Sequence, residues 1–142
     1  MAVTCGVHKL VVDIAIRAGD RVLFVKYKDV SRYDGQRGWF LPDDYLGHLE
    51  HPDEAAKRIA TTQTGLTSAV PKLSHIESFE DGAWHLIFHY QTDFKAMPRV
   101  APGPNVAALE WFPRSRLPDR SLMAHEGWAA DVLDAMDRRG SD

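Results

Sequence analysis

At 142 residues, with 44% hydrophobic and 26% charged residues, the chain has the composition of an ordinary globular protein and the length of a single domain, expected over residues 1–142. Its net charge of −3 gives no basic face for duplex nucleic acid, although a local group of arginines remains compatible with a small phosphorylated ligand. No hydrophobic run approaches the roughly 18–20 residues that span a bilayer, so we expect no membrane partner.

The N-terminal residues predict a β-hairpin. The start, MAVTCGVHKL, lacks the basic region and hydrophobic core of a signal peptide, which favours a cytoplasmic protein. Its Cys5 is the chain's one cysteine and excludes an internal disulfide or a cysteine-based zinc site. Residues 9–16 (KLVVDIAI) and 21–27 (RVLFVKY) are rich in β-branched side chains and flank a turn at Gly19, so they predict two paired strands.

A polar loop is predicted over residues 28–38 (KDVSRYDGQRG), which contain two glycines. Arg32 and Arg37 are candidates for binding phosphate, and Tyr33 is a candidate for stacking on a base. Arg99, in a later loop, is a further candidate for an anion. A loop that simply faces solvent is the alternative interpretation.

Residues 39–66 predict a short strand, a turn-rich crossing and a helix. Trp39 to Leu41 form the strand, which Pro42 closes. Pro52 occupies a favoured first helical position, and Gly65 ends the helix about three turns later. Helical spacing gathers the hydrophobic side chains of this helix on one side: Ala55, Ala56, Ile59 and Ala60.

The C-terminal half predicts a second hairpin and a final helix. Residues 70–80 and 83–94 are strands around an Asp-Gly turn, and in the second strand His85 and His89 share a face. These histidines form either a ligand-facing wall or a half-solvated sheet face. Residues 95–105 hold three prolines and predict a loop, residues 106–112 predict a strand, and a helix is expected from Ser121.

The segment from Trp39 to Leu66 resembles the Nudix box, the loop-helix-loop signature of nucleoside-diphosphate hydrolases. That box reads G, five residues, E, seven residues, then R-E-U-x-E-E-x-G-U, where U is aliphatic. Glu50, Arg58, Gly65 and Leu66 match it. Residues 111–118 (WFPRSRLP) resemble the ending of many Nudix domains, and the order of predicted elements resembles the Nudix fold. The resemblance implies an α/β fold, an α/β/α sandwich with a mixed central sheet.

The chain departs from the family at the positions that bind metal. The opening glycine is Asp44, and the three helical glutamates are replaced by Ile59, Thr62 and Gln63. Magnesium prefers carboxylate oxygens, so this set of side chains is a poor one for it. We expect these three side chains on the same side of the helix as Ala55 and Ala56. The loop at residues 95–105 contains no acid that could supply the family's additional glutamate.

Three functional hypotheses follow. The first is a Nudix-fold protein that binds a nucleotide-like small ligand without the family's Mg-dependent hydrolysis, with Glu50 and Arg58 either catalytic or a structural ion pair. The second is an active pyrophosphohydrolase of nucleoside-diphosphate-linked substrates that uses Mg or Mn. Its metal ligands would come from the acids and histidines of residues 43–54, among them His48, Glu50 and His51.

The third hypothesis is a non-catalytic regulatory or interaction module. Nudix domains commonly pair, so the resemblance also implies a homodimer. The chain has four tryptophans that either a core or an interface could use: Trp39, Trp84, Trp111 and Trp128. No cofactor follows from the sequence unless the enzyme hypothesis holds.

Overall fold

The computed structural model describes residues 8–140, and Cys5 lies outside them. The elements follow one another in this order: β1 (His8–Ala18), β2 (Arg21–Tyr27), β3 (Asp43–Tyr45), α1 (Pro52–Thr64), β4 (Lys72–Glu80), β5 (Trp84–Phe94), β6 (Val106–Pro113), the 3-10 turns η1 (Arg120–Leu122) and η2 (Ala124–Glu126), and α2 (Trp128–Gly140).

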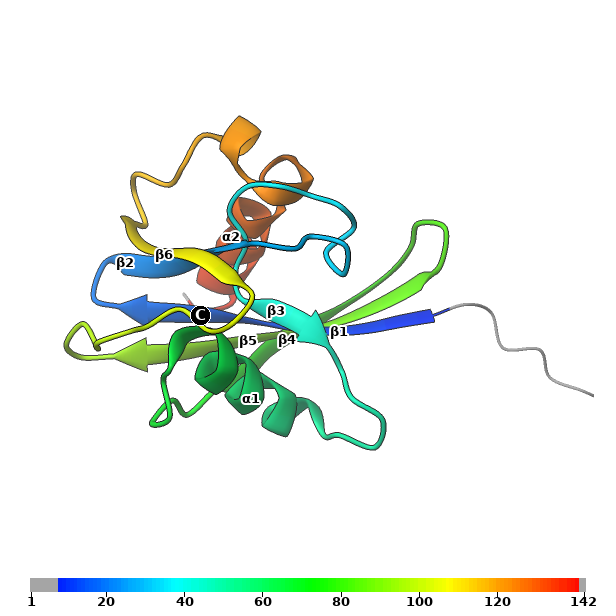
Figure 1. Cartoon of the computed structure of the whole chain (residues 1–142), viewed down its shortest axis with the longest axis horizontal. Coiled ribbons are helices and arrows are strands. Elements are labelled where there is room, and N and C mark those ends of the chain that lie inside the picture. The colour runs from blue at the N-terminus through cyan, green and yellow to red at the C-terminus, as the bar shows by residue number, and fades with distance from the viewer. Residues whose placement is uncertain (1–7, 141–142) are drawn as a thin grey trace, which may run out of the picture.

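A mixed sheet forms the centre of the fold, with strand order β4-β5-β1-β2-β6. Strand β1 pairs in parallel with β5, and it pairs antiparallel with β2 and with the short strand β3. Helix α1 covers one face of this sheet and α2 covers the other (Figure 1). The expected α/β/α sandwich with a mixed central sheet is confirmed.

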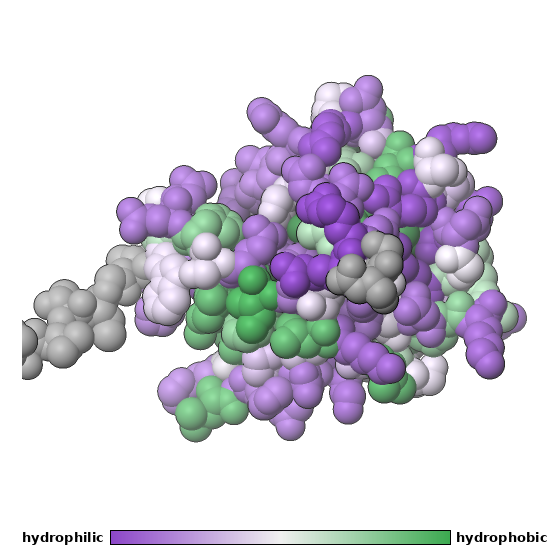
Figure 2. Space-filling view, turned by 180° about the vertical axis from the view of Figure 1, so that it is seen from behind, coloured by the Kyte–Doolittle hydropathy of each residue, from purple (hydrophilic) through white to green (hydrophobic). Residues whose placement is uncertain are grey.

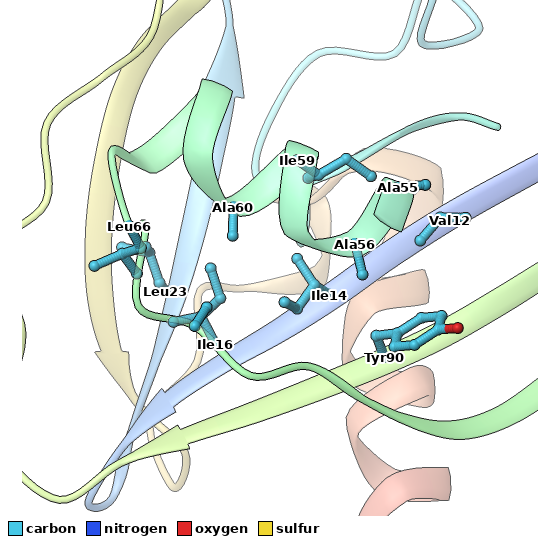
Figure 3. Packing of buried hydrophobic residues seen from close by; sticks show 11 residues of the cluster. Val12, Ile14, Ile16, Leu23, Ala55, Ala56, Ile59, Ala60, Leu66 and Tyr90 are labelled. Atoms are coloured by element: carbon cyan, nitrogen blue, oxygen red, sulfur yellow. The ribbon is translucent and has the colours of Figure 1, made fainter. Parts of the chain in front are cut away.

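Helix α1 begins and ends where its local signals predict. His51 caps its N-terminus, because the ring Nδ1 accepts the Asp53 amide at 3.0 Å, and Pro52 follows as the first helical residue. Gly65 ends the helix with φ at +77°, a left-handed conformation that glycine adopts without strain. The buried face of α1 packs on β1 and β5 in a hydrophobic cluster that includes Ile14, Ile59 and Tyr90 (Figure 3).

The alternation of side chains along β1 decides which residues face each helix. Val12, Ile14 and Ile16 belong to the cluster beneath α1, whereas Ala15 belongs to the cluster beneath α2. Asp13 lies on the α2 side as well, because alternate residues of a strand point to the same face. A fully buried acid therefore sits in the middle of a hydrophobic strand.

Two of the predicted boundaries are wrong. Trp39 and Phe40 make isolated bridges, and the strand follows Pro42 as β3, since residues 43–45 are the ones that pair in register with β1. The last helix begins at Trp128 and not at Ser121. Positive φ angles at His125 (51°), Glu126 (55°) and Gly127 (92°) interrupt helical geometry just before it.

The face opposite to the view of Figure 1 is mostly hydrophilic, with hydrophobic residues gathered in places (Figure 2). Trp84 is 52% exposed, whereas Trp39 is buried in the core. Within residues 8–140, no helix combines the length and the hydrophobicity that a membrane crossing requires.

Candidate functional site

The three substituted helix positions point into different surroundings. Ile59 is fully buried in the cluster between α1 and the sheet. Gln63 is 8% exposed and spans two partners: its Oε1 accepts the Tyr27 hydroxyl at 2.8 Å, and its Nε2 donates to the Asp43 carbonyl at 2.8 Å. Thr62 is exposed, and its hydroxyl donates to the Arg58 carbonyl at 2.8 Å.

The expectation that all three face the same way as Ala55 and Ala56 is wrong for Thr62. Helical periodicity gives the angle of a side chain around the axis. At about 100° per residue, Thr62 lies at the edge of the buried side, next to the partly exposed Arg58. Thr62 is therefore left in solvent while Gln63 is enclosed.

Glu50 and Arg58, the retained box residues, form a compact ion pair. Arg58 donates from Nε to Glu50 Oε2 at 2.9 Å and from Nη2 to Glu50 Oε1 at 3.1 Å, a two-pronged contact. Its Nη1 donates to Asp44 Oδ2 at 2.9 Å, and Nη2 also reaches the Tyr45 carbonyl at 3.0 Å. The hydrogen bonds from Arg58 lower the pKa of Glu50. This network ties the crossing before α1 to the middle of the helix.

The other donors of residues 43–54 are dispersed. His48 and His51 are exposed, and the His51 ring caps α1 while Glu50 is held by Arg58. Among residues 8–140, His48, Glu50 and His51 do not form a group close enough to share one metal ion. Their role as relocated metal ligands remains a prediction from the sequence.

A cleft of about 370 Å³ lies on the α2 side of the sheet. Its walls are rich in aromatic rings, and it is also lined by five acids and two cations. The aromatic residues are Tyr33, Phe40, Tyr45, Phe79 and Trp128; the acids are Asp34, Asp43, Asp44, Glu77 and Asp81; the cations are Lys9 and Arg32.

The cleft brings together three of the residues predicted to bind a ligand: Arg32, Tyr33 and His85. His85 stacks on Phe79 with ring centroids 4.8 Å apart. Arg37 and Arg99 are exposed and do not line the cleft, and His89 is buried beneath it. Ligand binding by any of the six remains a prediction.

Burial and neighbouring charge change the acid–base properties of the cleft wall. Burial, together with the charges of Asp13 and Asp44, raises the pKa of the Asp43 carboxyl well above its ordinary value of 3.8. Burial and the charge of Asp43 raise the pKa of Tyr33 to about 12. Tyr33 stacks on Tyr27 with centroids 3.7 Å apart, so two neutral phenols and a carboxyl that binds protons tightly lie side by side.

The raised pKa of Asp43 leads to a pH-dependent prediction. A carboxyl with a raised pKa binds its proton more tightly in the folded chain than in the unfolded chain, so it removes stability as pH rises from about 4 through the raised value. Asp43→Asn does not titrate. We expect its melting temperature to exceed that of the wild type by more at pH 8 than at pH 4, measured by circular dichroism. An equal difference at both pH values would contradict the raised pKa.

A row of ionisable side chains crosses four neighbouring strands beneath the cleft. The register aligns Asp43 of β3 with Asp13 of β1, Asp13 with His89 of β5, and His89 with His75 of β4. The His89 Nδ1 lies 2.8 Å and 2.9 Å from the two Asp13 oxygens, and its Nε2 lies 2.6 Å from Glu77 Oε1. Burial opposes a charge on His89, but Asp13 and Glu77 outweigh it and raise its pKa to about 9.

Sequence reasoning noted His89 but missed its partners. One signal was present, because Asp13 is the lone acid in the β-branched run KLVVDIAI, where an unpaired charge would be costly. His75 and Glu77 alternate along β4 as residues of one face do. No local pattern shows that these strands meet.

The comparisons with known proteins bear on this architecture. A family model described as the NUDIX domain matches residues 7–136. The chain belongs to the Nudix family. Nothing matches among curated proteins.

Solved structures share the fold at low identity, and two of the three that follow have Nudix in their names. A MutT NUDIX hydrolase from Burkholderia pseudomallei has a TM-score of 0.68 and 20% identity, covering 92% of this chain and 96% of that one. A MutT/nudix family protein from Enterococcus faecalis has a TM-score of 0.67 and 18% identity, over 80% of this chain and 46% of that one. A bifunctional NMN adenylyltransferase/ADP ribose pyrophosphatase from Francisella tularensis, complexed with AMP and a Mn ion, has a TM-score of 0.70 and 15% identity, over 96% and 43%. This chain thus spans less than half the length of the last two.

The divalent metal of the Nudix box does not fit the residues of this chain. Ile59 offers no donor atom and lies in the core. Both polar ends of the Gln63 amide are occupied by Tyr27 and Asp43, and the Thr62 hydroxyl bonds its own helix. Since hard cations take several oxygen ligands, mostly carboxylates, α1 supplies no site of the Nudix type for magnesium.

Proposed function

We propose that this Nudix protein binds a nucleotide-like small ligand in the cleft on the α2 side of the sheet and does not catalyse the Mg-dependent hydrolysis of its family. The observation that carries the proposal is the environment of Ile59 and Gln63. One is sealed in the core and the other is bonded at both ends, so the helix face that would hold the metal is used for structure.

The composition of the cleft supports a ligand held mainly through its rings and hydroxyls. Tyr33, Phe79 and Trp128 provide flat surfaces on which a base can stack. The acids outnumber Lys9 and Arg32, which disfavours a pyrophosphate deep in the cleft and leaves Arg32, with its side chain 64% exposed, for phosphate at the rim. The AMP with which the Francisella protein is complexed belongs to this class of ligand.

Thermal shift and turnover assays on one panel test the proposal. The full chain is incubated with AMP, ADP-ribose, NADH and nucleotide sugars, in EDTA and again with Mg²⁺ or Mn²⁺. We expect at least one of them to raise the melting temperature in EDTA, because a ligand that binds the folded state stabilises it, and none to be hydrolysed at ordinary enzyme rates. Hydrolysis that depends on Mg²⁺ or Mn²⁺ would favour the enzyme hypothesis. If none of the compounds binds, the proposal of a nucleotide-like ligand is overturned.

A matched pair of variants locates the binding. Tyr33→Ala removes a ring from the cleft wall. We expect it to weaken the affinity for the ligand about tenfold, which corresponds to the loss of one stacking contact of about 1.4 kcal/mol. Leu122→Ala changes an exposed side chain that does not line the cleft and should leave affinity unchanged. Equal affinities for both variants would place the ligand elsewhere. The single domain, the homodimer and the cytoplasmic location remain predictions.

A further inference from the structure

We propose that His75, Glu77 and His89 form a binding site for a divalent transition-metal ion, zinc above all, on the opposite face of the sheet from the Nudix helix. One donor atom from each residue lies within 4.8 Å of the others. The inference concerns these three side chains and does not depend on the proposed nucleotide-like ligand.

The backbone holds the three donors on rigid elements. His75 and His89 are register partners on β4 and β5, and Glu77 follows two residues later on the same face of β4. The two imidazole rings lie 4.6 Å apart between centroids. His75 and His89 are buried, so packing restricts their rotamers and favours a preformed pair of ligands.

Neighbouring groups orient both histidines. Asp13, fully buried on β1, accepts the Nδ1–H of His89, which directs Nε2 toward Glu77. This is the carboxylate–histidine arrangement that fixes the tautomer of a metal-binding imidazole and increases its basicity. Ser74 Oγ lies 2.8 Å from His75 Nδ1 and leaves the Nε2 of that ring for an ion.

The space needed for an ion is small. The Nε2 of His89 and Oε1 of Glu77 are 2.6 Å apart and share a proton, which leaves Nε2 for solvent when the ion takes its place. With zinc–ligand bonds of about 2.1 Å at tetrahedral angles, two donors lie about 3.4 Å apart, so the pair must open by roughly 0.8 Å. The Glu77 side chain is 37% exposed and lines the cleft, so it can make this movement without disturbing the core.

The donor set selects the class of metal. Two imidazoles and one carboxylate suit zinc and its neighbours among the transition metals, whereas magnesium and calcium prefer sites made of oxygens. The negative charges of Glu77 and Asp13 compensate a divalent ion. Three protein ligands leave a fourth position open, and Glu77 places that position at the cleft, where water or a ligand atom can occupy it.

Titration of the chelator-treated full chain with Co²⁺ and then Zn²⁺ tests the site. We expect one equivalent of Co²⁺ to bind and to give the visible absorption bands that are typical of a cobalt ion with a low coordination number. Zn²⁺ should then displace Co²⁺ and raise the melting temperature of the protein. Glu77→Gln is expected to weaken the affinity for Zn²⁺ at least about tenfold, and His75→Ala is expected to have a similar effect. Since His75 is buried, Glu77→Gln decides the outcome if the histidine variant does not fold.

The double variant His48→Ala/His51→Ala is the matched control, because it removes two exposed histidines that lie outside the cluster. It should bind the metal as the wild type does. Metal affinity that is unchanged by Glu77→Gln, lost with His48 and His51, or absent from the wild type at micromolar concentrations would overturn the proposal. The assay contains no nucleotide, so its result is independent of the ligand screen.

Discussion

Ile59→Glu is expected to lower the free energy of unfolding by about 4 kcal/mol or more, even though glutamate is the residue that the Nudix box has at this position. Ile59 is fully buried among hydrophobic side chains of α1, β1 and β5 (Figure 3). The substitution loses the hydrophobic contacts and leaves a carboxyl in the core without a partner, and the two losses add. Urea denaturation followed by tryptophan fluorescence measures the change.

Thr62→Glu is the control for this variant. It introduces the same residue, also a family residue, one turn later at an exposed position of the same helix. We expect a change within about 0.5 kcal/mol, as for other surface substitutions. If Ile59→Glu were as stable as Thr62→Glu and bound Mg²⁺, the helix face would be open to the family's metal and the proposed loss of hydrolysis would lose its main support.

His89→Leu is expected to cost about 3–5 kcal/mol of stability, measured in EDTA so that no metal contributes. His89 and Asp13 are both fully buried, with Nδ1 2.8 Å from the nearer oxygen of Asp13. Removing the imidazole leaves the Asp13 carboxyl buried without its partner, and breaking a buried pair on one side is costly. Urea unfolding curves of the variant and the wild type measure the difference.

The double variant Asp13→Leu/His89→Leu separates an unpaired charge from lost packing. It removes both polar groups, so we expect it to be more stable than His89→Leu alone. His85→Leu changes a histidine on the same face of β5 that is partly exposed at the cleft, and it should have a much smaller effect. If the double variant were as unstable as His89→Leu, the loss of stability would come from altered packing and not from the unpaired charge of Asp13.

The parts of this fold that could be predicted depend on local signals. Pro52 and Gly65 mark the ends of α1, and the turns at Gly19 and Gly82 separate paired strands. The strand at residues 43–45 could not be predicted, because three polar residues acquire β structure only by pairing with β1. The start of α2 was missed because helical spacing does not report the positive φ angles at residues 125–127.

The candidate site was less predictable than the fold. Arg32, Tyr33 and His85 were found by residue type, since cations, rings and histidines in loops and on strand faces are general candidates. The pairing of Asp13 with His89 depends on a parallel register between strands 76 residues apart, which no spacing rule reads. The replacement of the family's acids was visible at once, but its consequence required knowing that Ile59 is enclosed and Thr62 is not.

The parallel pairing of β1 and β5 also constrains how the chain folds. Strand β1 lies between β5 and β2 in the sheet, yet its longest pairing waits for a segment that ends at Phe94. During synthesis, the hairpin of β1 and β2 therefore emerges with one hydrophobic edge open and with Asp13 still hydrated. Asp13 meets His89 only when β5 arrives, and β6 and α2 follow later in the chain, so the charged row assembles through a long-range pairing and folding should be slow for a protein of this size.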